Sequence, residues 1–98
     1  MTMNTIRIEG TDLASRAQAS QLRNELIHSL NRGSPITLDL SNVESISDSF
    51  ADELFGVLSA SLGIEEFFNK IKVIGVKKHL GRVIAVNVNI RSGHQIAA

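Results

Sequence analysis

The sequence predicts an α/β layer fold, in which a mainly parallel or mixed sheet carries packed helices. Strand-like and helical segments alternate along the chain, and 98 residues with 43% hydrophobic content suffice for one core. The helical segments are long enough to serve as crossovers, and crossovers of about a dozen residues make neighbouring strands parallel. We therefore predict one small domain that spans residues 1–98.

The first segments are a strand and a helix. Ile6 and Ile8 alternate with polar residues, which is the period of a half-buried strand, and Gly10 ends the pattern. Ser15 followed by Gln18 matches a capping box at the start of a helix. The helix is amphipathic, and its apolar stripe comprises Ala19, Leu22, Leu26, Ile27 and Leu30.

A second strand and a second helix follow. Residues 36–41 alternate between apolar and polar after Pro35, which predicts a strand. Ser47 or Asp48 is expected to cap the next helix, and carboxylates in its first turn suit the helix dipole. The apolar stripe of this helix is Phe50, Leu54, Leu58 and Leu62, widened by Ala51, Phe55 and Val57.

The last third of the chain contains a strand and a segment that fits two patterns. Residues 70–76 predict a strand, and residues 65–68 are interpreted as the link before it, with one phenylalanine in the core and the other exposed. From Lys77 onward one set of residues fits a helix and another alternates as in a strand, so both structures remain open. The helical set is Leu80, Val83, Ile84 and Asn87, and the alternating set is Val86, Val88 and Ile90.

The charges cancel in total but are segregated along the chain. Residues 39–66 hold seven acids and no Lys or Arg, whereas residues 67–98 hold six bases and no acid. We expect the two segments to neutralise each other in the fold, the alternative being an acidic face for a basic partner. Zero net charge and four aromatic residues, all Phe, argue against nucleic-acid binding.

Composition also bears on the compartment. The chain has no cysteine, so nothing in it requires an oxidising environment. No apolar run approaches the roughly 18 residues that span a bilayer, and residues 1–10 lack the pattern of a secretory signal. We expect a cytoplasmic protein that does not insert into a membrane.

Polar residues at the predicted helix starts form the candidate site. Parallel strands end at one edge of a sheet, so the starts of the following helices should gather at that edge. Arg16 is expected to form an ion pair with Asp48 or Asp52, the alternative being a fork for a ligand's carboxylate or phosphate. The expected cluster comprises Ser15, Arg16, Ser47, Asp48, Ser49, Asp52, Lys77, Lys78 and His79.

Two stretches of the sequence carry a resemblance to a known family. The run Ile36-Thr37-Leu38-Asp39-Leu40-Ser41-Asn42-Val43, with the serine-led helix after it, resembles the STAS domain of bacterial anti-sigma-factor antagonists. Residues 15–19 and the run Ser49-Phe50-Ala51-Asp52-Glu53-Leu54-Phe55 are similar to a STAS-like bacterial branch of unknown function that has a Phe-Ala-Asp-Glu helix start. The resemblance covers most of the chain, from Ile6 to Ala85.

The resemblance implies a non-enzymatic regulatory module without a cofactor. It implies a protein partner, either an ATPase with a histidine-kinase-like fold or an anti-sigma factor. Ser49 matches the serine that such a kinase phosphorylates, although antagonists carry glycine where this chain has Phe50, and an ordinary first-turn serine is the alternative. A phosphate would add about −1.5 to −2 charges beside carboxylates and so alter docking. The expected partner-binding residues are Ser47, Asp48, Ser49, Asp52, Glu53, Gly56 and Arg16.

A second class of function would use carboxylates. Asp39, Asp48 and Asp52 would serve a metal-dependent or ligand-binding domain, whereas Asp39 is otherwise expected to accept hydrogen bonds from the loop after it. The three histidines lie at spacings that match neither a zinc site nor a base–nucleophile pair, so no catalytic residue or metal ligand is expected. The sequence leaves the oligomeric state open, including self-association through the third strand or through the C-terminal segment.

Overall fold

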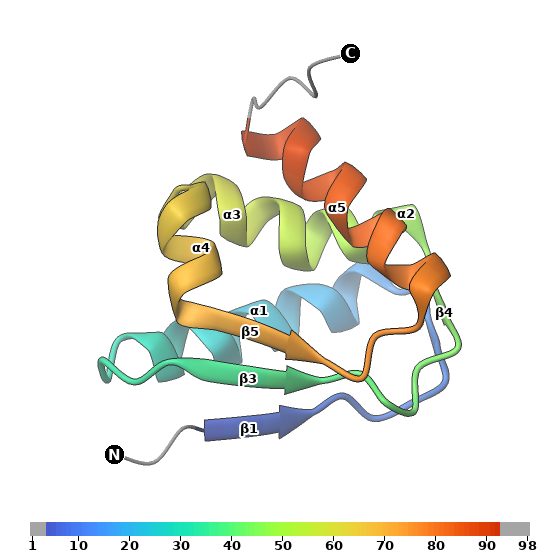
Figure 1. The fold of residues 1–98 in the computed structure, drawn as a ribbon, viewed down its shortest axis with the longest axis horizontal. Coiled ribbons are helices and arrows are strands. Elements are labelled where there is room, and N and C mark those ends of the chain that lie inside the picture. Colours follow the sequence, from blue (N-terminus) through green and yellow to red (C-terminus); the bar gives the residue numbers. More distant parts are fainter. Residues whose placement is uncertain (1–3, 93–98) are drawn as a thin grey trace.

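Three parallel strands in the order β1-β3-β5 form the main sheet of the computed structural model, which describes residues 4–92 (Figure 1). A second, two-stranded parallel sheet pairs β2 with β4. The predicted α/β fold class is therefore confirmed. Along the chain the elements are β1 Asn4–Arg7, β2 Asp12–Leu13, α1 Arg16–Leu30, β3 Ile36–Asp39, β4 Ser45–Ile46, α2 Asp48–Ala51, η1 Asp52–Gly56, α3 Val57–Leu62, α4 Ile64–Lys70, β5 Ile71–Ile74 and α5 Lys78–Ser92.

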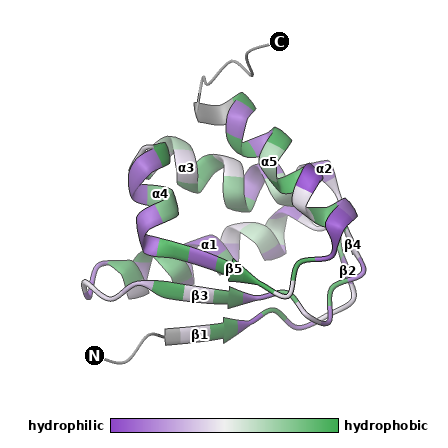
Figure 2. Ribbon diagram, viewed as in Figure 1, coloured by the Kyte–Doolittle hydropathy of each residue, from purple (hydrophilic) through white to green (hydrophobic). Residues whose placement is uncertain are grey.

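The central strand β3 is buried on both of its faces. Ile36 and Leu38 point to the core and are fully buried, and Figure 2 shows hydrophobic positions along β3 and β5. Thr37 points to the opposite face and is also buried, because β1 and β5 flank it. On that face Arg7 and Lys72, which belong to the two edge strands, are exposed. The helices therefore pack on the face that carries Ile36 and Leu38.

The second helix contains a turn that the sequence does not predict. It starts as α2 at Asp48, widens into the π-helical segment η1, and continues as α3 to Leu62. Leu54, Phe55 and Gly56 are consecutive buried residues of η1. An α-helix rotates 100° per residue and would turn one of three such neighbours away from its packed side. Here η1 packs against both α1 and α5, so all three are covered.

The segments around β5 resolve two expectations. Residues 65–68 belong to helix α4, so their interpretation as a link was wrong: Gly63, with φ +86°, ends α3 and lets a new helix begin. The division of the phenylalanines is confirmed, because Phe67 is 2% exposed and Phe68 is 65% exposed. After Lys77 the chain forms α5, so the helical alternative is confirmed and the strand alternative is wrong.

One hydrophobic core joins the sheet to the helices. Its largest fully buried side chains include Phe50 and Phe55 from the second helix and Leu38 from β3. Among residues 4–92, none of the helices is long and apolar enough to cross a membrane.

The charged segments do not neutralise each other in the way that the sequence suggests. Most carboxylates of residues 39–66 that form ion pairs contact arginines from the first third of the chain, which corrects the expectation. Within the described part of the chain, Lys72, Lys78 and Arg82 have no ion-pair partner. The ion pairs are Asp39 with Arg7, Asp52 and Glu53 with Arg16, Glu53 with Arg23, Glu44 with Lys77, and Glu66 with Lys70.

Candidate functional site

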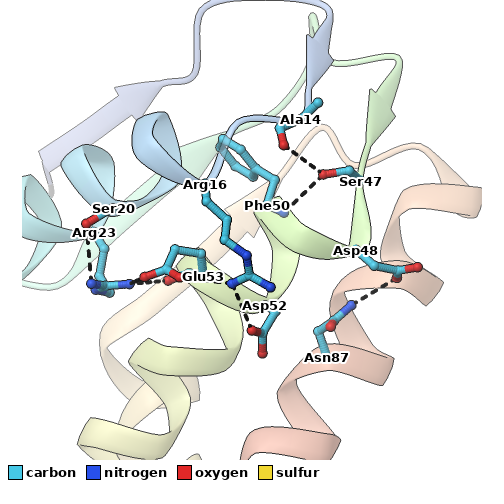
Figure 3. Close-up of polar contacts among 10 residues, drawn as sticks. All are labelled: Ala14, Arg16, Ser20, Arg23, Ser47, Asp48, Phe50, Asp52, Glu53 and Asn87. Atoms are coloured by element: carbon cyan, nitrogen blue, oxygen red, sulfur yellow. Dashed lines mark hydrogen bonds and ion pairs between the residues drawn. The ribbon is translucent and has the colours of Figure 1, made fainter.

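Two serines fix the starts of α1 and α2. The Ser15 hydroxyl caps α1, and the Ser47 hydroxyl accepts a hydrogen bond from Phe50 N at 3.0 Å. Ser47 Oγ also donates to the carbonyl oxygen of Ala14 at 3.2 Å (Figure 3). Ser47 rather than Asp48 is thus the N-cap of α2, and its hydroxyl holds the two helix starts side by side.

An ion-pair network joins α1 to η1. Arg16 Nη1 lies 3.2 Å from Asp52 Oδ2 and 2.9 Å from Glu53 Oε1, and Arg23 donates to the other carboxylate oxygen of Glu53 (Figure 3). Hydrogen bonds from Arg23 and then Arg16 lower the pKa of Glu53, and those to Glu53 and Asp52 raise the pKa of Arg16. The expected ion pair between Arg16 and Asp52 is confirmed, and Glu53 is the acid that both arginines share.

Glu53→Gln is expected to lower the free energy of unfolding by roughly 1.5–3 kcal/mol at pH 7, the contribution of a hydrogen bond to a charged group. In the wild type the Glu53 carboxylate has a lowered pKa, so its charged form stabilises the fold at pH values above the unfolded-state pKa of about 4.3. This contribution is lost as the pH falls through the folded-state pKa. Urea unfolding between pH 7 and 3 should therefore show a shallower acid-side loss in Glu53→Gln than in wild type.

The matched control for this prediction is Glu25→Gln, at an exposed position on α1. The control should follow the wild-type profile at every pH. If Glu53→Gln lost stability with acid as steeply as wild type does, the shared carboxylate would not be the acid-sensitive link between α1 and η1.

Ser49 is exposed in the first turn of α2, and within residues 4–92 its hydroxyl has no hydrogen-bond partner. The neighbouring Asp48 is also exposed and accepts a hydrogen bond from Asn87 Nδ2 at 3.3 Å (Figure 3). Phe50 is 2% exposed, so its ring lies in the core and does not cover the serine. Gly56, in contrast, is buried in η1, which packs against two other helices, so it lies apart from the exposed residues of the second helix.

The start of α5 is tied to a different part of the site. Figure 1 shows α1, α2 and α5 beginning at the same end of the sheet. Lys77 Nζ donates to the carbonyl oxygen of Ser41 at 3.1 Å, and His79 Nε2 lies 2.8 Å from the carbonyl oxygen of Glu44. Lys78 is exposed beside them. These contacts hold the start of α5 on the loop between β3 and β4, apart from the ion-pair network of α1 and η1.

Asp39 has a structural role at the end of β3. Its Oδ1 accepts hydrogen bonds from Ser41 N at 2.9 Å and Ser41 Oγ at 2.5 Å, and its Oδ2 lies 3.4 Å from Arg7 Nε. The hydrogen bond from the Ser41 hydroxyl is the largest cause of its lowered pKa. The expectation that Asp39 binds the following loop is confirmed. Asp39, Asp48 and Asp52 each bind different partners. Residues 4–92 contain no group of three His, Cys, Asp or Glu side chains that could hold a metal ion. The metal-dependent alternative is therefore not favoured.

Two polar residues that were not predicted complete the site. Arg23 follows Arg16 by seven residues, which is two helical turns, so this spacing was an available signal for a shared face. Asn87 is buried and binds Asp48 across two helices. Its role has no local signal in the sequence, because it depends on how α5 packs against α2.

The parallel sheet and the helices that share one core with it define a small α/β domain. Residues 18–80, well over half of the chain, match the family model described as a STAS-like domain of unknown function (DUF4325), and the chain belongs to that family. Searches of curated proteins and of solved structures found no match. Family membership suggests a regulatory protein-interaction module and nothing more specific.

Proposed function

We propose that this domain is a non-enzymatic cytoplasmic module that docks a regulatory protein through the start and exposed face of its second helix. Ser49 is the proposed switch. The proposed partner is an ATPase with a histidine-kinase-like fold or an anti-sigma factor, the two classes implied by the STAS-like resemblance. The observation that carries the proposal is the exposed Ser49 hydroxyl, which lies one helical turn before the carboxylates that Arg16 binds.

Electrostatics supports a switch at this position. Ser49 precedes Asp52 and Glu53 by three and four residues, so the three side chains share a helix face. A phosphate would add about −1.5 to −2 charges to that face, repelling both carboxylates and competing for Arg16. The Arg16 side chain is 52% exposed and is therefore accessible to a phosphate. Ser47 is less suited to modification, because its hydroxyl already makes two hydrogen bonds.

Affinity capture with Ser49→Glu tests the switch. Immobilised wild type, Ser49→Glu and Ser49→Ala would be exposed to the same cell extract, and retained proteins would be quantified by mass spectrometry. We expect Ser49→Glu to retain at least about tenfold less of the wild-type partner, since a like charge in a docked surface costs several kcal/mol. Ser49→Ala should retain as much as wild type. An ATPase captured in this way should transfer phosphate to the wild type and not to Ser49→Ala.

Two further variants separate switching from docking. Gln21→Glu also adds a carboxylate, at an exposed position on α1 and therefore outside the second helix, and should leave capture unchanged. Asp48→Lys reverses a charge on the proposed docking face and should reduce capture. Equal capture by wild type and Ser49→Glu would remove the switch, and equal capture by wild type and Asp48→Lys would remove docking at this face.

A further inference from the structure

An apolar groove of about 700 Å³ lies beside β5, between α4 and α5. Its walls include Phe67 from α4, Val73 from β5, and Ile84 and Val88 from α5, and Phe68 stands at its rim with 65% of its surface exposed. A volume of this size is typical of sites that bind ligands or peptide segments. None of the residues of the helix-start site lines the groove, so it is a separate surface.

The outer edge of β5 borders this groove. The strand order β1-β3-β5 makes β5 an edge strand within residues 4–92 (Figure 1). The carbonyl oxygen of Ile74 accepts a hydrogen bond from Leu40 N at 2.9 Å, so the main chain of Ile74 faces β3. Main-chain groups alternate in direction along a strand, and the N–H and C=O of Val73 therefore point outward, away from β3. An edge strand with unused donors and acceptors is a template for an added strand.

The charge of the groove selects among possible occupants. No acidic residue lines the groove, and of its two lysines Lys70 pairs with Glu66 on α4, whereas Lys72 has no ion-pair partner in the described part of the chain. A second copy paired edge to edge through β5 would bring these lysines close to the same lysines of its partner, which is unfavourable. An added strand would place one set of alternate side chains on the helix side with Val73 and the other set beside Lys72.

We propose that the groove binds an extended segment of a partner protein, which adds to the sheet as a strand beside β5. Apolar side chains of that segment enter the groove between α4 and α5, and alternate carboxylates face Lys72. This interaction is independent of the proposed switch at Ser49, so either can fail without the other.

Three synthetic peptides test the proposal by NMR titration of the ¹⁵N-labelled protein. The acidic peptide alternates glutamate with valine, the basic peptide alternates lysine with valine, and the third is the acidic peptide with every backbone amide N-methylated. We expect the acidic peptide to shift the amide signals of residues 71–75, Ile84 and Val88. It should bind about fivefold more tightly than the basic peptide, the effect of a favourable cross-strand charge pair. The N-methylated peptide should cause no shift, because it cannot pair with the strand edge.

Two variants locate the charge effect. Lys72→Glu should reverse the preference between the acidic and basic peptides, whereas Lys78→Glu makes the same change at an exposed position outside the groove lining and should not. Equal binding of the acidic and N-methylated peptides would overturn strand addition. Binding of decanoate at these residues without binding of the acidic peptide would identify a small-ligand pocket instead. A dimer in sedimentation that Phe68→Ser dissociates would assign the groove to a second copy.

Discussion

Phe55→Ala is expected to lower the free energy of unfolding by about 3–5 kcal/mol, one of the largest losses from any single truncation in this domain. Phe55 is fully buried in η1, which packs against α1 and α5. Removing its ring leaves a cavity that three packed helices can fill only in part. Small domains have a total stability of about 5–15 kcal/mol, so the variant should lose a large share of it. Urea denaturation followed by circular dichroism measures the loss.

Phe68→Ala is the matched control for this prediction. It removes the same atoms from a side chain that is 65% exposed and contacts the Phe67 ring edge-to-face, so it should lower the free energy of unfolding by at most about 1.5 kcal/mol. Equal losses in Phe55→Ala and Phe68→Ala would mean that η1 is not packed as the structure describes. A loss in Phe55→Ala alone would show that the π-helical turn belongs to the core.

Local patterns in the sequence predicted the elements whose stabilising contacts are also local. The capping role of Ser15 depends on residues within one helical turn, and the alternation of residues 36–41 predicted β3. The ion pair of Arg16 with Asp52 was one of the two that the sequence predicted, the other being with Asp48, although Arg16 and Asp52 lie 36 residues apart. It could be predicted because parallel strands place the starts of successive helices at the same edge of the sheet.

Other features depend on tertiary packing and leave no local pattern. Each strand of the second sheet has two residues, and two residues are too few to show a period. The π-helical turn packs against two helices at once, which the order of Leu54, Phe55 and Gly56 alone does not reveal. The partners of the acidic segment were mispredicted for the same reason. Charge segregation suggested that the acids of residues 39–66 pair with the basic C-terminal residues. Instead, β1 and α1 lie closer to most of the paired acids and supply arginines to them.

Gly75→Ala should destabilise the domain by about 2–5 kcal/mol, because it combines backbone strain with a steric clash. Gly75 has φ +70°, and that conformation costs a residue with a Cβ about 1–2 kcal/mol. An added Cβ would also lie 2.9 Å from Ser41 N, and overpacking typically costs about 1–3 kcal/mol. Ser41 cannot easily move away, since it donates two hydrogen bonds to Asp39 and its carbonyl accepts one from Lys77.

Gly33→Ala isolates the backbone part of this cost. Gly33 has φ +85°, and nothing lies within 4 Å of the position that its Cβ would take, so only the strain of about 1–2 kcal/mol applies. The clash at Gly75 has a second readout, because a displaced Ser41 no longer donates to Asp39. In Gly75→Ala the pKa of Asp39, measured by NMR titration, should rise toward its ordinary value, whereas in Gly33→Ala it should not change. Equal stability losses in the two variants, with an unchanged Asp39 pKa, would show that the loop after β3 is not held against Gly75.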